Sequence, residues 1–326
     1  MRIGRLFGGF ALVAACASGA RTAGADSLSV LTYNVAGLPE RISASHPLTN
    51  HPQISPLLNA YDLVAVQEDF AYHPLLVQDL TFPYQSVKDD TAGPAGEQLG
   101  FAFGDGLNSF SRLPFTDFER ITWNDCFGLF TDGSDCLTPK GLSFQRHELA
   151  PGAFLDVYNW HADAGGGAND LEARRWNTRQ LYETIVDRSA GNAVLVLGDT
   201  NSRFTRDGDV LPEMLAAASL TDVWTELVRG GVLPPIGASL TDCGTDSAGA
   251  SCEHIDKVFY RSSSSLLLQA VEYDVPSHFV DALGGPLSDH DPVYARFEWR
   301  AVPEPGSVAL LGAGLAMLAR RRQRER

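Results

Sequence analysis

The sequence predicts an α/β protein in which β-sheets pack against each other and carry helices on their outer faces. Apolar runs of strand length recur along the chain, whereas few segments have helical length and a helical cap. The composition is that of a globular protein, with 44% hydrophobic and 20% charged residues among 326. Sheets with interspersed helices bury their apolar faces in layers, so a layered packing is expected.

The first 25 residues have the order of a secretory signal peptide. Arg2 and Arg5 precede an apolar run at residues 6–17, and small residues then lead to Ala25. The run is shorter than the roughly 20 apolar residues of a stable membrane-spanning helix. It also contains Cys16 in a context that resembles a bacterial lipoprotein box. Lipidation of this cysteine is therefore the alternative interpretation.

Residues 302–326 resemble the PEP-CTERM sorting signal of Gram-negative bacteria. The tripeptide Pro303-Glu304-Pro305 is followed by an apolar run at residues 307–319 and by an arginine-rich end. The apolar run is too short for a comfortable membrane span. The resemblance implies contact with a sorting machinery and export to the periplasm, the outer surface or the extracellular matrix.

The region between these two signals is acidic. The full chain has a formal net charge of −15, and both terminal signals are rich in arginine, so the central region is more negative still. An acidic surface repels polyanions at long range. The charge therefore argues against tight non-specific binding of nucleic acid, although it does not exclude a nuclease.

Four cysteines remain between the signals, at Cys126, Cys136, Cys243 and Cys252. An even number in an exported chain predicts two disulfide bonds. The short separations favour Cys126 with Cys136 and Cys243 with Cys252 among the three possible arrangements. Zinc binding is the alternative, but the chain lacks the Cys-x-x-Cys spacing typical of structural zinc sites.

The predicted elements follow each other along the central region. An alternating strand at residues 29–35 ends before Gly37, and a short helix at residues 53–60 precedes a continuous apolar strand at residues 62–68. Further strands are expected at residues 99–103, 106–110, 141–148, 154–160, 193–197, 254–260 and 293–299. The longest predicted helix covers residues 170–188, with Asn169 or Asp170 as its cap and Gly191 as its stop.

Several of these strands end in polar side chains that strand periodicity does not explain. They are Asn34, Glu68, His161 and Asp199. Burying such groups without partners is costly. We therefore expect these strand ends to lie at one edge and to form a functional site.

Seven short motifs occupy these strand ends and the segments near them. They are Thr32-Tyr33-Asn34, Val66-Gln67-Glu68, Gly106-Leu107 with residues 110–114, Asn159-Trp160-His161, Gly198-Asp199-Thr200-Asn201, Ile255-Asp256, and Ser288-Asp289-His290 with residues 291–293. In this order they resemble the endonuclease/exonuclease/phosphatase superfamily over residues 29 to about 298. The resemblance implies one domain, residues 26–301, with the deoxyribonuclease I-like fold, a four-layered α/β/β/α sandwich. It also implies metal-dependent hydrolysis of a phosphoester.

The resemblance assigns a metal site and a base. Glu68, Asn34 and Asp289 would hold Mg²⁺ or Mn²⁺, hard cations that prefer oxygen ligands. His290 would act as the general base, because an imidazole accepts a proton near neutral pH. Asp256 would orient this imidazole, as in a hydrolase triad.

Three further residues are expected to act on the phosphoryl group. Asp199 would orient the attacking water, while Asn201 and His161 would contact phosphoryl oxygens. The residue before His161 departs from the family pattern, because Trp160 stands where a small or hydroxyl residue is usual.

The segment from Cys126 to Gly141 resembles part of the secreted bacterial sphingomyelinases, in which a Lys-Gly pair begins a strand. Lys140 is accordingly expected to bind substrate. The aromatic hairpin of those enzymes is reduced here to residues 277–280. Within the loop at residues 126–136, Phe127 and Phe130 either contact a lipid surface or pack on the sandwich, and both placements stay open.

Three functions are compatible with these observations. The preferred one is a phospholipase C-like or sphingomyelinase-like phosphodiesterase that contacts a membrane peripherally. The second is a deoxyribonuclease I-like nuclease, and the third is a non-catalytic matrix protein with the same fold. Arginines clustered at the site would favour the nuclease, the candidates being Arg112, Arg174, Arg175 and Arg179. Apolar loops there would favour the lipid enzyme, and a monomer is expected in each case.

Overall fold

The computed structural model describes residues 25–43, 45–93, 96, 100, 102–130, 133–240, 243 and 249–303. Almost all of the predicted signal peptide, including Cys16, and almost all of the sorting signal lie outside the described residues. Among the described residues, no helix has the length and apolar character that a membrane span requires.

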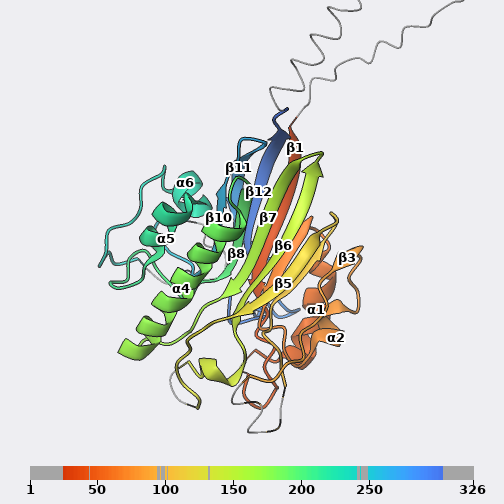
Figure 1. Ribbon diagram of the computed structural model, residues 1–326. Helices are drawn as coiled ribbons and strands as arrows, with labels where there is room; N and C mark the ends of the chain where they lie inside the picture. Colours follow the sequence, from red (N-terminus) through yellow and green to blue (C-terminus); the bar gives the residue numbers. More distant parts are fainter. Residues whose placement is uncertain are drawn as a thin grey trace, which may run out of the picture.

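Two six-stranded sheets form the centre of the molecule (Figure 1). The first has the order β11-β12-β1-β2-β4-β3, and the second has the order β5-β6-β7-β8-β10-β9. The strands of the first sheet are β1 (Asp26–Asn34), β2 (Leu63–Gln67), β3 (Tyr84–Gln85), β4 (Asn108–Ser111), β11 (Leu266–Asp274) and β12 (Val293–Ala301). Those of the second are β5 (Thr116–Thr122), β6 (Gly141–Ala150), β7 (Ala153–His161), β8 (Ala193–Asp199), β9 (Thr221–Asp222) and β10 (Asp256–Arg261).

Each sheet contains one parallel pair near its middle. β1 pairs with β2, and β7 pairs with β8, whereas the other ladders are antiparallel. Parallel neighbours need a crossover connection, which here contains α1 (Pro47–Leu58) or α4 (Ala168–Arg188). Because parallel strands end at the same edge, the polar residues that follow β1 and β2, or β7 and β8, become neighbours.

Apolar side chains form three layers of core. One lies between the sheets and includes Val30 and Leu195. The second layer lies between the outer face of the second sheet and the helices α4, α5 (Leu211–Ala218) and α6 (Val223–Val228). The third layer lies between the first sheet and the helices α1 and α2 (His73–Val77). Figure 1 shows α4, α5 and α6 on one side and α1 and α2 on the other. The predicted four-layered α/β/β/α sandwich is therefore confirmed.

The predicted cap of the long helix is wrong. Helix α4 begins at Ala168 with Gly167 as its N-cap, so Asp170 lies inside the first turn. Its carboxylate accepts a hydrogen bond from the Gly167 backbone amide at 2.7 Å. Asp170 lies three residues after the N-cap, and its carboxylate accepts the hydrogen bond of the otherwise unpaired N-cap amide.

Two strand predictions also differ from the structure. The expected strand at residues 99–103 is wrong for its described residues, since Gly100, Ala102 and Phe103 are not in a strand. Strands β3, β5, β9 and β11 were not predicted. β5 is an edge strand with no buried residue, so its sequence lacks the alternation that marks a half-buried strand.

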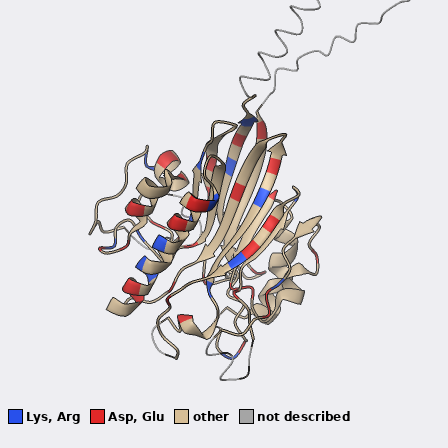
Figure 2. Cartoon of the chain, viewed as in Figure 1, with Lys and Arg blue, Asp and Glu red and all other residues tan. Residues whose placement is uncertain are grey.

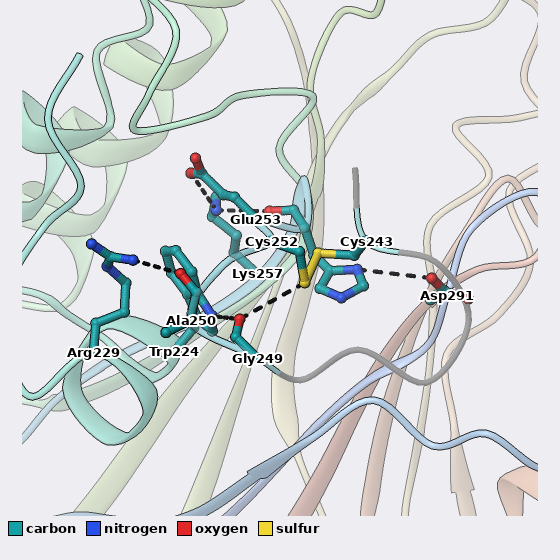
Figure 3. The surroundings of a disulfide bond; sticks show 10 residues. Trp224, Arg229, Cys243, Gly249, Ala250, Cys252, Glu253, Lys257 and Asp291 are labelled. Carbon is teal, nitrogen blue, oxygen red and sulfur yellow. Dashed lines mark hydrogen bonds and ion pairs between the residues drawn. A yellow bond between two sulfur atoms is a disulfide. The ribbon is translucent and has the colours of Figure 1, made fainter. Parts of the chain in front are cut away.

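Both predicted disulfide bonds are present, Cys126–Cys136 and Cys243–Cys252. The bonded cysteines are therefore not free to act as the zinc ligands of the alternative interpretation. Figure 3 shows the second bond between Cys243 and Cys252. Its sulfur atoms lie within 4.8 Å of a ring nitrogen of His254, and His254 Nδ1 lies 4.0 Å from Asp291 Oδ2. This bond closes the segment that leads into β10.

The first disulfide is expected to stabilise the fold. Closing a loop of 10 residues restricts the unfolded chain, so Cys126→Ser/Cys136→Ser should lower the free energy of unfolding by about 2–3 kcal/mol. Urea unfolding followed by circular dichroism measures this change. Peptide mapping of the exported protein checks the pairing. A variant as stable as the wild type, or free thiols at all four positions, would contradict the assignment.

Candidate active site

The register of the second sheet brings three predicted site residues side by side. Asp199, the last residue of β8, pairs with His161 of β7 on one side and with Asp256 of β10 on the other. All three side chains are buried. Strand pairing therefore collects one imidazole and two carboxylates at a single edge of the sheet.

Asn34 links the first sheet to this cluster. Its Nδ2 donates to Asp199 Oδ2 and to Glu68 Oε1, both at 3.1 Å, and lies 3.5 Å from His290 Nε2. Its Oδ1 accepts from the Ala36 amide at 3.0 Å, which fixes the orientation of the side-chain amide. One buried asparagine thus contacts residues from both sheets.

Glu68 follows β2 in a backbone conformation that is unusual for a residue with a side chain. Its φ is 57°, in the left-handed region, and its carbonyl accepts from the amides of Gly37 and Phe70 at 2.9 and 2.8 Å. A Cβ atom at Gly37 would lie 2.4 Å from this carbonyl oxygen, so only glycine fits there. Strained backbone of this kind is frequent at functional sites, and here it directs the Glu68 carboxylate toward Asn34.

His290 and Asp256 form a close pair. His290 Nδ1 lies 2.7 Å from Asp256 Oδ2, and His290 Nε2 lies 3.7 Å from Asp199 Oδ2. Burial acts to lower the pKa of His290, but the negative charges of Asp256 and Asp199 raise it well above 6.5. Burial also raises the pKa of Asp256. Asp256 therefore favours the protonated form of the His290 imidazole.

Asp199 remains ionised although it is buried. Burial opposes its charge, yet His290, His161 and the hydrogen bond from the Asn201 amide hold the pKa of Asp199 well below its usual value. Asn201 has a φ of 48° and donates from Nδ2 to the Ala162 carbonyl at 3.0 Å. The Asp199-Thr200-Asn201 turn is thus fixed by bonds at both ends.

Lys140 is buried beside His161. Its ammonium pairs with Asp135 and donates to His161 Nε2 at 3.1 Å. Burial opposes this charge, but Asp135 and Glu68 raise the pKa of Lys140 above its usual value. His161 Nε2 also lies 3.4 Å from Asp199 Oδ2 and 3.9 Å from Glu68 Oε1. Lys140 is therefore placed to orient His161, and its contact with substrate stays a prediction.

Two predicted features lie at the margin of the cluster. The Asp289 side chain is exposed, with Oδ1 3.4 Å from the Ser288 hydroxyl, so its role as a metal ligand stays a prediction.

Trp160 is fully buried in the core beneath α4, where its ring meets that of Trp123 edge-on at 6.3 Å. Strand alternation turns Trp160 and His161 to opposite faces of the sheet, so the tryptophan leaves the site unchanged.

Sequence reasoning missed two residues that hold the site together. The Ser288 hydroxyl donates to the Asn34 carbonyl at 2.7 Å and accepts from the His290 amide at 3.2 Å. Asp135 is fully buried and also accepts from the Ala164 amide at 2.9 Å. The sequence signal for Ser288 was its position in the motif Ser288-Asp289-His290. Asp135 lies next to Cys136 in a loop where no periodicity indicates burial.

The donors around Glu68 fit a hard divalent cation. Glu68 is partly accessible, and it offers carboxylate oxygens beside the amide of Asn34. Asp199, Asp256 and His290 form a second group whose ligand atoms lie within 4.8 Å of one another. His290 is already paired with Asp256, so the more accessible Glu68 is the better anchor for a cation.

The four candidate arginines do not gather around this site. Arg174 is buried against Asp209, and Arg175 bonds the Gly208 carbonyl. Arg179 pairs with Glu213, while Arg112 bonds the carbonyls of Tyr61 and Asn59. Figure 2 shows basic residues of α4 interspersed with acidic ones. The basic patch that the nuclease hypothesis requires is not formed by these residues.

Comparison with known proteins gives matches at the C-terminus and over the central region. The PEP-CTERM protein-sorting motif matches residues 301–323, which indicates export through a sorting machinery in Gram-negative bacteria. The chain is 36% identical over 277 residues to sphingomyelinases of Mycobacterium bovis and Mycobacterium tuberculosis. The match covers 84% of this chain and 53% of each relative. The chain thus spans about half the length of these curated relatives.

Solved structures share the fold at low sequence identity. Sphingomyelinase C from Streptomyces griseocarneus has a TM-score of 0.55 at 21% identity, and a two-residue mutant of beta toxin from Staphylococcus aureus with bound magnesium ions has 0.56 at 17%. Humanized D. rerio TDP2 has a TM-score of 0.58 at 18% identity. Each match covers 83% of this chain and 99% of the other chain. The deoxyribonuclease I-like sandwich predicted from the motifs is confirmed.

The buried pair of Lys140 and Asp135 gives a testable energetic prediction. Lys140→Met should cost about 3–5 kcal/mol of unfolding free energy, because it leaves the Asp135 carboxylate buried without its counter-charge. Asp135→Asn/Lys140→Met removes both charges and should lose less than the two single changes together. Urea unfolding of the four proteins measures the coupling. Additive losses would show that the two charges do not stabilise each other.

Proposed function

We propose that this chain is an exported, divalent-metal-dependent phosphodiesterase of the sphingomyelinase type. The observation that carries the proposal is the meeting of Glu68, Asn34, Asp199 and the His290–Asp256 pair within hydrogen-bonding distance at the strand ends. The similarity to sphingomyelinases over most of this chain supports the same conclusion. The proposal extends to the domain, residues 26–301, and to export to the periplasm, the outer surface or the extracellular matrix.

The proposed cation is Mg²⁺ or Mn²⁺, held by Glu68 with Asn34 and with Asp289 at the margin. A bound divalent cation would neutralise charge that develops on the phosphoryl oxygens. Magnesium commonly takes one or two carboxylates and retains water, which fits the small number of oxygen donors around Glu68. The magnesium ions bound to the similarly folded beta toxin support this choice of metal.

His290 is the proposed general base. Its Nδ1 is held by Asp256, so its Nε2 faces Asp199 and Asn34 and is available to accept a proton from water. The oxygen of this water forms a bond to phosphorus while the bond from phosphorus to the alcohol oxygen breaks. Asp199 orients the water, and Asp256 stabilises the imidazolium that results.

His161 and Asn201 are the proposed partners of the phosphoryl oxygens. His161 Nε2 lies 3.1 Å from Lys140 Nζ, 3.4 Å from Asp199 Oδ2 and 3.9 Å from Glu68 Oε1, so the positive charge of Lys140 lies on the side where the phosphoryl group would bind. Asn201 follows Asp199 in a fixed turn. Preorganised donors and charges of this kind stabilise a transition state at little reorganisation cost.

Substrate hydrolysis tests the function directly. The purified protein with Mg²⁺ should hydrolyse bis-p-nitrophenyl phosphate and sphingomyelin more efficiently than plasmid DNA. Glu68→Gln removes one charge at nearly constant shape, so it should lower turnover at least about 100-fold and weaken Mg²⁺ binding measured by calorimetry. Glu119→Gln, on the edge strand β5, is the matched control. Near wild-type turnover of Glu68→Gln in limiting Mg²⁺ would refute the metal site, and preferential cleavage of DNA would favour the nuclease.

The His290–Asp256 pair predicts a pH dependence. His290→Ala should reduce turnover by about 10²–10⁴-fold, because the base is lost. Asp256→Asn should reduce it less and should also move the acidic limb of the kcat/KM profile to lower pH. The sign follows because Asp256 raises the pKa of His290, and the imidazole acts as a base only above that pKa. An acidic limb at the same pH in Asp256→Asn would contradict the pairing.

A further inference from the structure

A buried ion pair, Glu253 with Lys257, has no part in the function proposed above. Glu253 is 1% exposed and Lys257 is 4% exposed. Lys257 Nζ donates to Glu253 Oε1 at 3.0 Å and to the His254 carbonyl at 2.7 Å, and Figure 3 shows the two charged groups facing each other. Apolar residues in place of a buried ion pair often stabilise a fold equally well. Stability alone is therefore a weak reason for these two charges.

The Glu253 carboxylate holds the segment that follows β8. Its Oε1 accepts from the Phe204 amide at 2.5 Å, and its Oε2 accepts from the Thr205 hydroxyl and amide at 3.0 and 3.3 Å. Burial opposes the charge of Glu253, but Lys257 and the Phe204 amide hold the pKa of Glu253 below its usual value. The carboxylate is therefore ionised, and hydrogen bonds to an ionised acceptor are stronger than neutral ones.

Asn201 lies between two points at which this segment is attached. Before it, the amide and the hydroxyl of Thr200 donate to the Ile255 carbonyl at 3.0 and 2.7 Å. After it, the Phe204 amide donates to Glu253. Asn201 itself has a φ of 48°, and a left-handed backbone of this kind persists only where the surrounding contacts hold it. Residues 253–255 thus hold the turn on both sides of Asn201.

Strand β10 separates the ion pair from the proposed base. Neighbouring residues of a strand point to opposite faces of the sheet. Asp256 pairs with His290 on one face, whereas Lys257 lies over the rings of Phe204 and Trp224 on the other, with Nζ 4.8 and 5.6 Å from their centroids. The ion pair is therefore placed to act on the turn after β8 and not on the base.

We propose that Glu253 and Lys257 are positioning residues, which fix Asn201 for its contact with the phosphoryl group. The inference rests on the phosphodiesterase function proposed above and adds two residues that do not touch the substrate. Asp199 is already held by strand pairing on both sides. Asn201 lies beyond the paired residues, so its position depends also on the attachment of the following segment to Glu253.

Glu253→Gln/Lys257→Met tests the inference, because it removes both charges and leaves neither buried alone. For bis-p-nitrophenyl phosphate, it should lower kcat about 10–100-fold and change KM less than about twofold, because a misplaced donor acts mainly on the transition state. In an Asn201→Ala background, the same change should lower kcat less than about twofold. The acidic limb of the kcat/KM profile should stay at the wild-type pH, because the pair faces away from His290.

Hydrogen exchange tests the attachment without any activity. The amides of Phe204 and Thr205 should exchange at least about tenfold faster in Glu253→Gln/Lys257→Met than in the wild type. Arg146→Met/Asp156→Asn is the matched control for both measurements. It removes another buried ion pair of the second sheet, in which Arg146 Nε lies 2.6 Å from Asp156 Oδ1. This control should lower stability but keep kcat within about twofold of the wild type.

The outcomes separate this inference from the function on which it rests. An undiminished loss of kcat in the Asn201→Ala background, a shifted acidic limb, or an equal loss of kcat in the control would overturn the positioning role. Wild-type exchange of the Phe204 and Thr205 amides in the double variant would overturn the attachment itself. A wild type that does not hydrolyse bis-p-nitrophenyl phosphate would refute the phosphodiesterase function, whereas the exchange rates would still decide whether Glu253 holds the segment.

Discussion

The buried charge of Asp199 sets the main constraint on the site. A carboxylate without water is unfavourable unless hydrogen bonds and opposite charges surround it. The protein supplies Asn34 from the facing sheet, His161 from a neighbouring strand and His290 from the loop before β12. Each of these partners is also a candidate for the chemistry. The groups that would act on a phosphoester are thus the groups that make the buried carboxylate tolerable, so stability and function depend on the same contacts.

The features that could be predicted are those with a local signal. Buried strands have apolar periodicity, and a polar residue where the apolar run stops marks a strand end, which is how Glu68 and Asp199 were found. The two disulfides followed from the short separations of the cysteines. The layered fold class followed from strand runs with interspersed helices, and the four-layered sandwich followed from the resemblance carried by the seven motifs. The predicted strand ends meet in the structure because parallel strands collect their ends at one edge of a sheet.

The remaining features depend on contacts between distant segments. The burial of Lys140 requires Asp135 and His161 to surround it, and neither partner is marked by sequence spacing. The cap of α4 differed because Asp170 reaches back to the Gly167 amide. The exposed edge strand β5 lacks a periodic pattern. A cavity beside Glu68 is lined by residues of four separate segments, among them Leu38, Phe103 and Phe130. Propensity describes single segments, whereas these features arise from packing and register.

Strand β12 connects the candidate active site with the C-terminal sorting motif. The strand begins just after His290 and ends at Ala301, where the sorting motif begins. Nine extended residues span roughly 30 Å, and Figure 1 shows the start of β1 and the end of β12 at the same pole of the molecule. In a chain held by its C-terminal segment, the candidate active site would therefore lie at the end of the molecule away from the attachment point. In the proposed function, such a geometry would direct hydrolysis away from the point of attachment.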